Sequence, residues 1–306
     1  MGSELDKSLT HDVLLDLAGE RYFERGAGYR VGYDEIKNGG LIPGSETAEK
    51  VIIAAGSLGS TELLLRCRDQ HKTLPNVSQF LGHNWSSNGD FLTPAIHKHR
   101  DVSMWEGPTI TCGIDFLKEP FEGQRFTIED GGGPDFLFNW LKAEKDRGQK
   151  INLLIKEMNE LLQGDERHVM LWFANGVDAA NGRLYLRRPW FWPWHGKRLH
   201  LDWEIKKSKA LFDAIFKMHT LLAEKTGGKV ITSPLWKYFN LLITPHPLGG
   251  CNMGRSPADG VVNHKGEVFG YQNLYVADGA IIPEAIGINP SRTIAALAER
   301  IVELMK

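Results

Sequence analysis

Three segments near the end of the chain decide the fold: TPHPLGGC at residues 244–251, NLYVADGA at 273–280 and GINPSRTIAALAER at 287–300. In the first, His246 stands between two prolines and precedes two glycines, so a stiff backbone holds the imidazole while the glycines let a ligand come close. In the second, an apolar run of strand length ends in Asp278 and Gly279, which predicts a buried strand delivering a carboxylate at its carboxyl end. Open α/β sheets bind their ligands at that edge.

The third segment predicts a helix that starts at a functional position. Asn289 is a favoured capping residue and Pro290 a favoured first helical residue. A helix start carries roughly half a positive charge and stabilises an anion placed against it, so Asn289, Pro290 and Ser291 are candidates for holding an anionic cofactor group. One apolar face of this helix is formed by Ile294, Leu297, Ala298 and Ile301.

A second strand and helix are predicted earlier in the chain. The apolar run from Val51 to Gly56 leads through a glycine and serine turn into a helical pattern. Such a turn offers free backbone N–H groups, so Ala55, Gly56 and Ser57 are candidates for contacting a phosphate or a ring carbonyl. An ordinary buried strand and helix explains these residues about as well.

In their joint order, the elements PLGGC, NLYVADG and NPxxTIxALAER resemble the C-terminal part of the glucose-methanol-choline (GMC) flavoenzymes, and in particular their bacterial cholesterol-oxidase branch. The resemblance implies FAD as cofactor and oxidation of an alcohol to a carbonyl, with hydride transfer to flavin N5. It implies His246 as the base and Asn289 as the residue that orients the substrate oxygen. It also implies cofactor contacts from Ala55, Gly56, Ser57, Asp278, Gly279, Asn289, Pro290 and Ser291.

Glu129 ends an alternating run and is followed by Asp130 and three glycines. This loop would let the two carboxylates lie close together, which raises the pKa of one of them. A solvated strand end is the alternative. By resemblance, the segment lies where cholesterol oxidases carry a glutamate that moves a ring proton of the substrate.

The expected fold class is α/β with α+β elements: a partial FAD-binding Rossmann-like domain and an antiparallel-sheet substrate-binding domain with helices. The expected boundaries are 1–100 and 241–306 for the two parts of the FAD domain and 101–240 for the substrate domain. Strands are expected at 28–36, 109–114, 125–129, 169–173 and 183–186, and helices at 136–163 and 202–225. The turn signal at 38–40 predicts that the first of these strands opens a hairpin. The glycine and asparagine loop at 81–90 is of a kind that lines sites, although a surface turn is equally compatible.

No G-x-G-x-x-G turn between a strand and a helix is found in the 306 residues, although a GMC enzyme needs one for the flavin diphosphate. One alternative is therefore a fragment or a subunit whose partner chain carries that unit. A nicotinamide dehydrogenase built on Ala54, Gly56 and Gly59 is disfavoured, because no acidic residue follows a second strand about twenty residues later.

Composition sets further limits. The 36 basic and 38 acidic residues are mixed along the chain, which argues against nucleic acid or an anionic membrane as a partner. Cys67, Cys112 and Cys251 show no disulfide framework, and no signal peptide or spanning segment is present, so a cytoplasmic location is favoured. His97 and His99 lack a third ligand, so no metal site is expected.

The run RRPWFWPWH at 187–195 has too many aromatic residues for a solvated turn. It predicts a core or subunit contact first, a substrate channel second and a membrane-contacting loop third. A substrate channel would suit a bulky apolar alcohol, sterols included, with oxygen or another compound as the electron acceptor.

Overall fold

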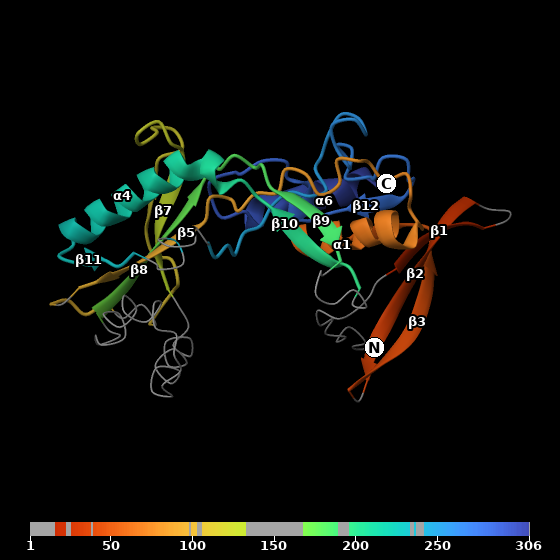
Figure 1. The fold of residues 1–306 in the computed structure, drawn as a ribbon, viewed down its shortest axis with the longest axis horizontal. Helices are drawn as coiled ribbons and strands as arrows, with labels where there is room; N and C mark the ends of the chain where they lie inside the picture. The colour runs from red at the N-terminus through yellow and green to blue at the C-terminus, as the bar shows by residue number, and fades with distance from the viewer. Residues whose placement is uncertain are drawn as a thin grey trace.

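The structure is a computed structural model that describes residues 16–22, 26–37, 39–97, 99–102, 106–132, 168–188, 196–232, 236 and 242–305. The described part is elongated (Figure 1), with a five-stranded antiparallel sheet and α4 near one end and a three-stranded sheet at the other. Between them lie a parallel pair of strands and the helices α1 and α6.

The parallel pair joins β4 (Val51–Ile53) to β12 (Leu274–Val276), two strands more than 200 residues apart in sequence. Strand β4 leads into α1 (Gly56–Leu65), which continues as the π-helical turn η1 (Arg66–His71). Strand β12 leads into the short 3-10 helix η4 (Gly279–Ile281), and the chain closes with α6 (Ser291–Leu304). Both strands predicted from apolar runs are confirmed. The glycine and serine turn expected after the first run is instead the first turn of α1.

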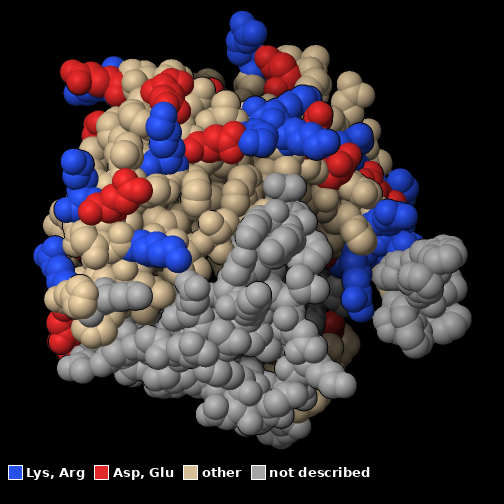
Figure 2. All heavy atoms as spheres, turned by 60° about the vertical axis from the view of Figure 1, so that its left-hand side comes forward, with Lys and Arg blue, Asp and Glu red and all other residues tan. Residues whose placement is uncertain are grey.

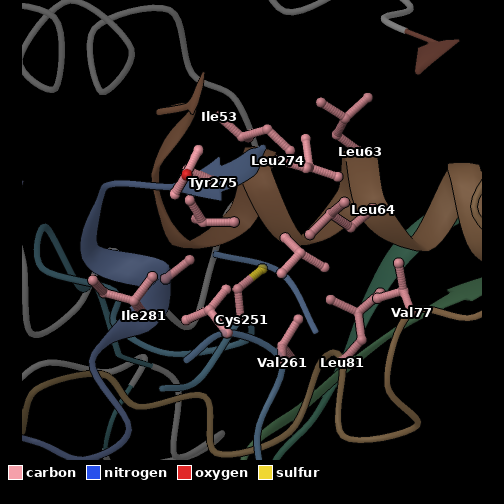
Figure 3. Packing of buried hydrophobic residues seen from close by; sticks show 14 of the residues in the cluster. Ile53, Leu63, Leu64, Val77, Leu81, Cys251, Val261, Leu274, Tyr275 and Ile281 are labelled. Carbon is pink, nitrogen blue, oxygen red and sulfur yellow. The ribbon is translucent and has the colours of Figure 1, made fainter. Parts of the chain in front are cut away.

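Buried side chains from both halves of the sequence form the core around this pair (Figure 3). Leu64 on α1, Leu274 on β12 and Cys251 are each fully buried. Burial raises the pKa of the Cys251 thiol to about 12, so this cysteine is neutral and serves packing.

The two glycines after His246 allow the backbone to pass close to two other segments. Gly249 and Gly250 have φ angles of +80° and +104°. A Cβ at Gly249 would stand 2.1 Å from the carbonyl oxygen of Asn84, and one at Gly250 would stand 2.2 Å from Oγ1 of Thr61. The sequence PLGG is therefore required by the packing of this segment between α1 and the loop at 81–90.

The second core lies between the antiparallel sheet and α4 (Lys209–Lys225), which covers one face of it (Figure 1). Strand residues alternate between the two faces, so Ile128 and Ala174 face the helix while Thr127, Glu129, Phe173 and Asn175 share the opposite face. We call this opposite face the site face. The strands are, in order, β11 (Lys229–Val230), β5 (Phe91–Ile96), β8 (Val169–Gly176), β7 (Phe126–Gly131) and β6 (Gly113–Asp115).

Two further sheets complete the described part. Strands β9 (Arg183–Arg187) and β10 (Arg198–Asp202) form an antiparallel pair. Strands β1 (Asp16–Tyr22), β2 (Gly26–Lys37) and β3 (Gly40–Ala48) form the three-stranded sheet, and the hairpin expected after residue 36 is confirmed.

Several expected boundaries were wrong. The strand expected at 109–114 is only Gly113–Asp115, because the backbone N–H groups of Thr111 and Cys112 donate to the Asp130 side chain instead of a strand. The helix expected from residue 202 starts at Lys209, after β10 and the turn η3 (Ile205–Ser208). The helices expected at 136–163 and the aromatic run at 189–195 lie outside the described residues.

The division into domains stays a prediction. The antiparallel sheet already includes β5, which starts at Phe91 and therefore lies before the expected boundary at residues 100 and 101.

Acidic and basic side chains lie next to one another over much of the face in Figure 2. In the described ranges, no group of three or more acidic, histidine or cysteine side chains has the arrangement of a metal site, and His97 contacts the Thr226 hydroxyl. Cys67 and Cys251 are buried, and Cys112 is exposed. None of the helices described is both long and apolar enough to cross a bilayer.

The buried His219 on α4 makes stability depend on pH. Its Nδ1 lies 2.8 Å from Oγ1 of Thr93, and burial lowers its pKa to about 3. In the unfolded chain this histidine binds a proton near pH 6.5, whereas in the folded chain it stays neutral. The free energy of unfolding should therefore fall by about 1.4 kcal/mol per pH unit as the pH falls from about 6.5 toward 3. Urea unfolding of the wild-type chain and of His219→Met at pH 7 and pH 5 tests this, and equal pH slopes for the two proteins would contradict it.

Candidate active site

A buried carboxylate holds His246 from two sides. The Asp90 side chain is fully buried, and its Oδ1 lies 3.1 Å from Nδ1 of the His246 imidazole. Its Oδ2 accepts hydrogen bonds from the backbone N–H of His246 at 2.9 Å and from the Thr244 hydroxyl at 2.7 Å. The position of the imidazole is therefore fixed by one carboxylate as well as by its flanking prolines.

This contact also determines which ring nitrogen of His246 carries the proton. A carboxylate oxygen only accepts, so the neutral imidazole is protonated at Nδ1 and its Nε2 keeps a free lone pair. The Asn175 amide lies 3.2 Å from the same Nδ1, but it donates to Asp90 Oδ1 at 2.6 Å. The exposed fraction of the His246 side chain is 23%. The ring can therefore act as a base through Nε2.

His246 adjoins the site face of the antiparallel sheet. Its ring centroid lies 5.7 Å from that of Phe173, and Asn175 follows two residues later on the same strand. Phe173 pairs across the sheet with Glu129 on β7, so the two side chains share this face.

Asn289 reaches the site face at Glu129. Its amide Nδ2 lies 2.8 Å from Oε1 and 2.9 Å from Oε2 of Glu129. Because the distances are nearly equal, one amide hydrogen can serve both oxygens, and the second hydrogen is left for another acceptor. His246 and Asn289 are therefore brought to one face of one sheet, and each has its own carboxylate partner.

Two expectations about these residues were wrong. Pro290, and not Asn289, occupies the capping position of α6, and Asn289 uses its amide on Glu129 instead. The carboxylates of Glu129 and Asp130 do not form a pair, because neighbouring strand residues point to opposite faces. Burial alone would raise the pKa of Asp130, but hydrogen bonds from Thr111 and Cys112 outweigh it, and the pKa lies below its ordinary value.

A turn at Ser86–Asp90 holds the segment that precedes Asn289. The Asn88 side-chain oxygen accepts from the backbone N–H of Ile286 at 3.0 Å and of Gly287 at 3.1 Å, and its amide donates to the Ile288 carbonyl at 2.9 Å. The Thr127 hydroxyl donates to the Gly287 carbonyl at 2.9 Å.

The turn is held in its own conformation by Asp178. This carboxylate accepts hydrogen bonds from both Ser86 and Ser87, at distances of 2.8 to 2.9 Å. Sequence reasoning marked the 81–90 loop only as a candidate site lining. It did not identify Asn88, Asp90, Asn175 or Asp178, whose partners are between about 70 and 200 residues away in sequence.

Of the predicted cofactor residues, Ala55, Gly56, Ser57, Asp278 and Gly279 gather at the junction of β4, β12 and α1. Asp278 Oδ2 accepts from the backbone N–H of Gly56 at 2.9 Å and from the Ser60 hydroxyl, and its Oδ1 accepts from the N–H of Ala280 at 2.8 Å. Burial raises the pKa of the Asp278 carboxyl, and these hydrogen bonds offset part of that rise. The N–H of Gly56, expected to be free for a ligand, is therefore occupied.

This junction is also tied to the His246 segment. The Ser57 hydroxyl donates to the Gly249 carbonyl at 2.8 Å, and the N–H of Gly249 donates to the Gly279 carbonyl at 3.0 Å. Ala55 is exposed, and no atom lies within 4 Å of where a Cβ on Gly56 would stand. The junction therefore has open space for a ligand beside its backbone.

The first turn of α6 fits an anionic group. Pro290 provides no side-chain cap, no acidic residue lies in the first turn, and Ser291 is exposed. The α1 start, in contrast, already has the Asp278 carboxylate against it. Of the two helix starts, α6 is the one whose partial positive charge is not yet neutralised by a side chain.

An apolar pocket of about 380 Å³ lies between α1, the β9–β10 pair and the segment before His246. Thr244, which donates to Asp90, is at its edge. Its lining is Leu58, Trp85, Leu184, Leu199, His200, Leu201, Trp203, Leu242 and Thr244.

Comparison with known families gives the class to which this fold and site belong. A profile described as "GMC oxidoreductase" matches residues 129–298, which include Glu129, His246 and Asn289. The chain belongs to the GMC oxidoreductase family, which is FAD-dependent in general.

Individual relatives agree with this assignment. A cholesterol oxidase of Acinetobacter baumannii is 30% identical over 274 residues, which are 82% of this chain and 46% of that protein. A long-chain-alcohol oxidase of Arabidopsis thaliana is 38% identical over 74 residues, covering 23% of this chain and 10% of that protein. The chain thus spans about half the length of its cholesterol-oxidase relative.

Solved structures share the fold. The structure of formate oxidase superposes with a TM-score of 0.59 and 15% identity, covering 96% of this chain and 60% of that one. The expected fold class, with FAD-binding elements beside an antiparallel substrate-binding sheet, is confirmed.

The Asp278 contacts predict a large effect of a small change. Asp278→Asn should lower the free energy of unfolding by roughly 2–4 kcal/mol, because an amide offers one acceptor oxygen to three donors and adds a donor of its own. Ser60→Ala leaves the carboxylate and removes one of its donors together with the acceptor of the Ala55 N–H, so it should cost about 1–2 kcal/mol. Urea unfolding measures both, and an Asp278→Asn protein as stable as the wild type would contradict the prediction.

Proposed function

We propose that this chain carries the base and the substrate-orienting amide of an FAD-dependent enzyme that oxidises an alcohol to a carbonyl. The observation that carries the proposal is the Asp90–His246 contact, which leaves Nε2 unprotonated beside the same sheet face as Asn289. When bound, FAD supplies the hydride acceptor at its N5 atom.

The residues of the chain act on the alcohol oxygen. His246 Nε2 accepts the hydroxyl proton, and Asp90 stabilises the imidazolium that results because its carboxylate stays hydrogen-bonded to Nδ1. The amide hydrogen of Asn289 that Glu129 does not use donates to the same oxygen and orients the carbon-bound hydrogen. Oxygen or another acceptor takes up the electrons afterwards.

Cofactor contacts are proposed at the two ends of the site. The uncapped start of α6 at Pro290 and Ser291 supports an anionic part of the flavin. The backbone of Ala55, Gly56, Ser57, Asp278 and Gly279 borders the open junction. Because the N–H groups of Ala55 and Gly56 already donate to Ser60 and Asp278, we propose that this backbone packs closely against the flavin.

A bulky apolar alcohol is proposed as substrate, with Glu129 as the group that moves a ring proton if the substrate is a sterol. The apolar pocket of about 380 Å³ supports this class, since small-molecule sites are mostly apolar and about this large. The relatives named as oxidases of cholesterol and of long-chain alcohols support it as well.

The alternative is that a partner chain supplies the FAD diphosphate site. Among the described strands, β4 pairs only with β12, and Ile52 on β4 is 48% exposed. A further βαβ unit would cover this side chain. Mixing the purified protein with FAD distinguishes the two hypotheses. Flavin binding by the chain alone would exclude the alternative. Flavin binding only in the presence of a second polypeptide would support it.

His246 provides the main test. In the flavin-loaded protein, His246→Gln should lower alcohol turnover by roughly 10²- to 10⁴-fold while the flavin absorbance stays the same, because the proton acceptor is lost and the fold is not. His264→Gln, at a histidine outside the site, is the control. Unchanged turnover in His246→Gln would remove the proposed base.

The pocket provides the test of substrate class. Leu201, which is 41% exposed, lines the pocket, so Leu201→Glu should raise KM for long-chain or sterol alcohols and leave KM for short alcohols unchanged. Leu221→Glu on α4 is a matched control, because Leu221 is 38% exposed and does not line the pocket. The same rise in KM for both variants, or for neither, would count against this pocket as the substrate site.

A further inference from the structure

One turn of the chain makes direct contact with both sides of the candidate site. In the turn Ser86–Asp90, alternate side chains point to different partners: Asp90 holds His246, and Asn88 holds the segment before Asn289. The same turn is bonded to the His246 segment through reciprocal backbone hydrogen bonds between Ser86 and Leu248, both 3.0 Å.

The Asn88 side chain bonds to three of the four peptide units between Ala285 and Asn289. It accepts from the N–H groups of Ile286 and Gly287 and donates to the carbonyl of Ile288, the residue bonded to Asn289. The Asn88 side chain is fully buried, so water does not replace these bonds if they are lost. Its φ angle of +54° suits asparagine, glycine or aspartate and few other residues.

We propose that Asn88 is a positioning residue that aims the Asn289 amide at Glu129 and at the substrate oxygen. This inference rests on the proposed function, because it assigns how one of the two site groups reaches its place. Asn88 touches neither the substrate nor the cofactor in this scheme. It acts only through the backbone at 286–288, which also accepts a hydrogen bond from the Thr127 hydroxyl at Gly287.

The geometry separates Asn88 from a purely structural residue. The turn itself is stabilised by Asp178, through Ser86 and Ser87, and these bonds do not include the Asn88 side chain. Removing that side chain therefore leaves the turn and Asp90 in place and frees only the 286–289 segment. The effect should appear at Asn289 and not at His246.

The variants are chosen to keep the backbone. Asn88→Gly keeps the positive φ and loses all three bonds, whereas Asn88→Asp keeps both acceptor bonds and loses the donor to Ile288. Asn84→Gly is the matched control, because Asn84 lies in the same loop with a φ of +55° and an exposed side chain.

The first experiment is a double-mutant cycle on kcat/KM for a long-chain alcohol in the flavin-loaded protein. Asn88→Gly should lower kcat/KM by roughly 10- to 100-fold alone, and by less than about 3-fold when Asn289 is already alanine. Asn88→Asp should recover part of the loss, and Asn84→Gly should be unchanged. Equal losses with Asn289 and with Ala at that position would overturn the proposal.

The second experiment does not require activity. In protein labelled with ¹⁵N-asparagine, Asn289→Ala identifies the side-chain amide signals of Asn289, which should be protected from exchange by Glu129. Asn88→Gly should shift these signals and remove the protection, and Asn84→Gly should leave them unaltered. If the wild-type protein oxidises no alcohol, the proposed function fails while this measurement still tests the placement of Asn289. Unaltered Asn289 signals in the Asn88→Gly protein would overturn the inference that Asn88 positions Asn289.

Discussion

The Asp90 carboxylate is removed from water, and four donor groups converge on it. They come from Thr244, from Asn175 and from both the backbone and the ring of His246. A buried charge with fewer partners would be strongly unfavourable, so the carboxylate requires all these segments to lie together. The arrangement of β8, the Ser86–Asp90 turn and the TPHPLGGC segment follows from satisfying this one group.

Local sequence patterns were sufficient to predict the elements themselves. The apolar runs gave β4 and β12, the capping pattern gave α6 to within two residues, and the proline and glycine flanks of His246 marked an imidazole with a defined position. These predictions succeeded because each depends on residues that are neighbours in the chain. The same is true of the hairpin between β2 and β3.

What the sequence could not provide was the identity of the partners. Asn289 was predicted to cap its own helix, because an asparagine before a helix commonly bonds to the N–H groups of the first turn. Its amide instead donates to Glu129, which is 160 residues away in sequence. Likewise, Glu129 and Asp130 are neighbours in sequence and face opposite sides of a strand that runs two residues further than expected. The roles of Asn88 and Asp90 depend on long-range pairing in the same way, so composition marked their loop without distinguishing them.

The sharing of one turn between two sides of the site has a consequence for protein engineering. Exchanging residues 285–289 alone for a loop of another protein would bring in a different backbone path. The N–H and carbonyl groups of that loop would not meet the acceptor and donor of the Asn88 side chain. The smallest transferable module consists of that loop together with the Ser86–Asp90 turn and Asp178. Its members are widely spaced in the gene, so recombination at a single crossover point would separate them.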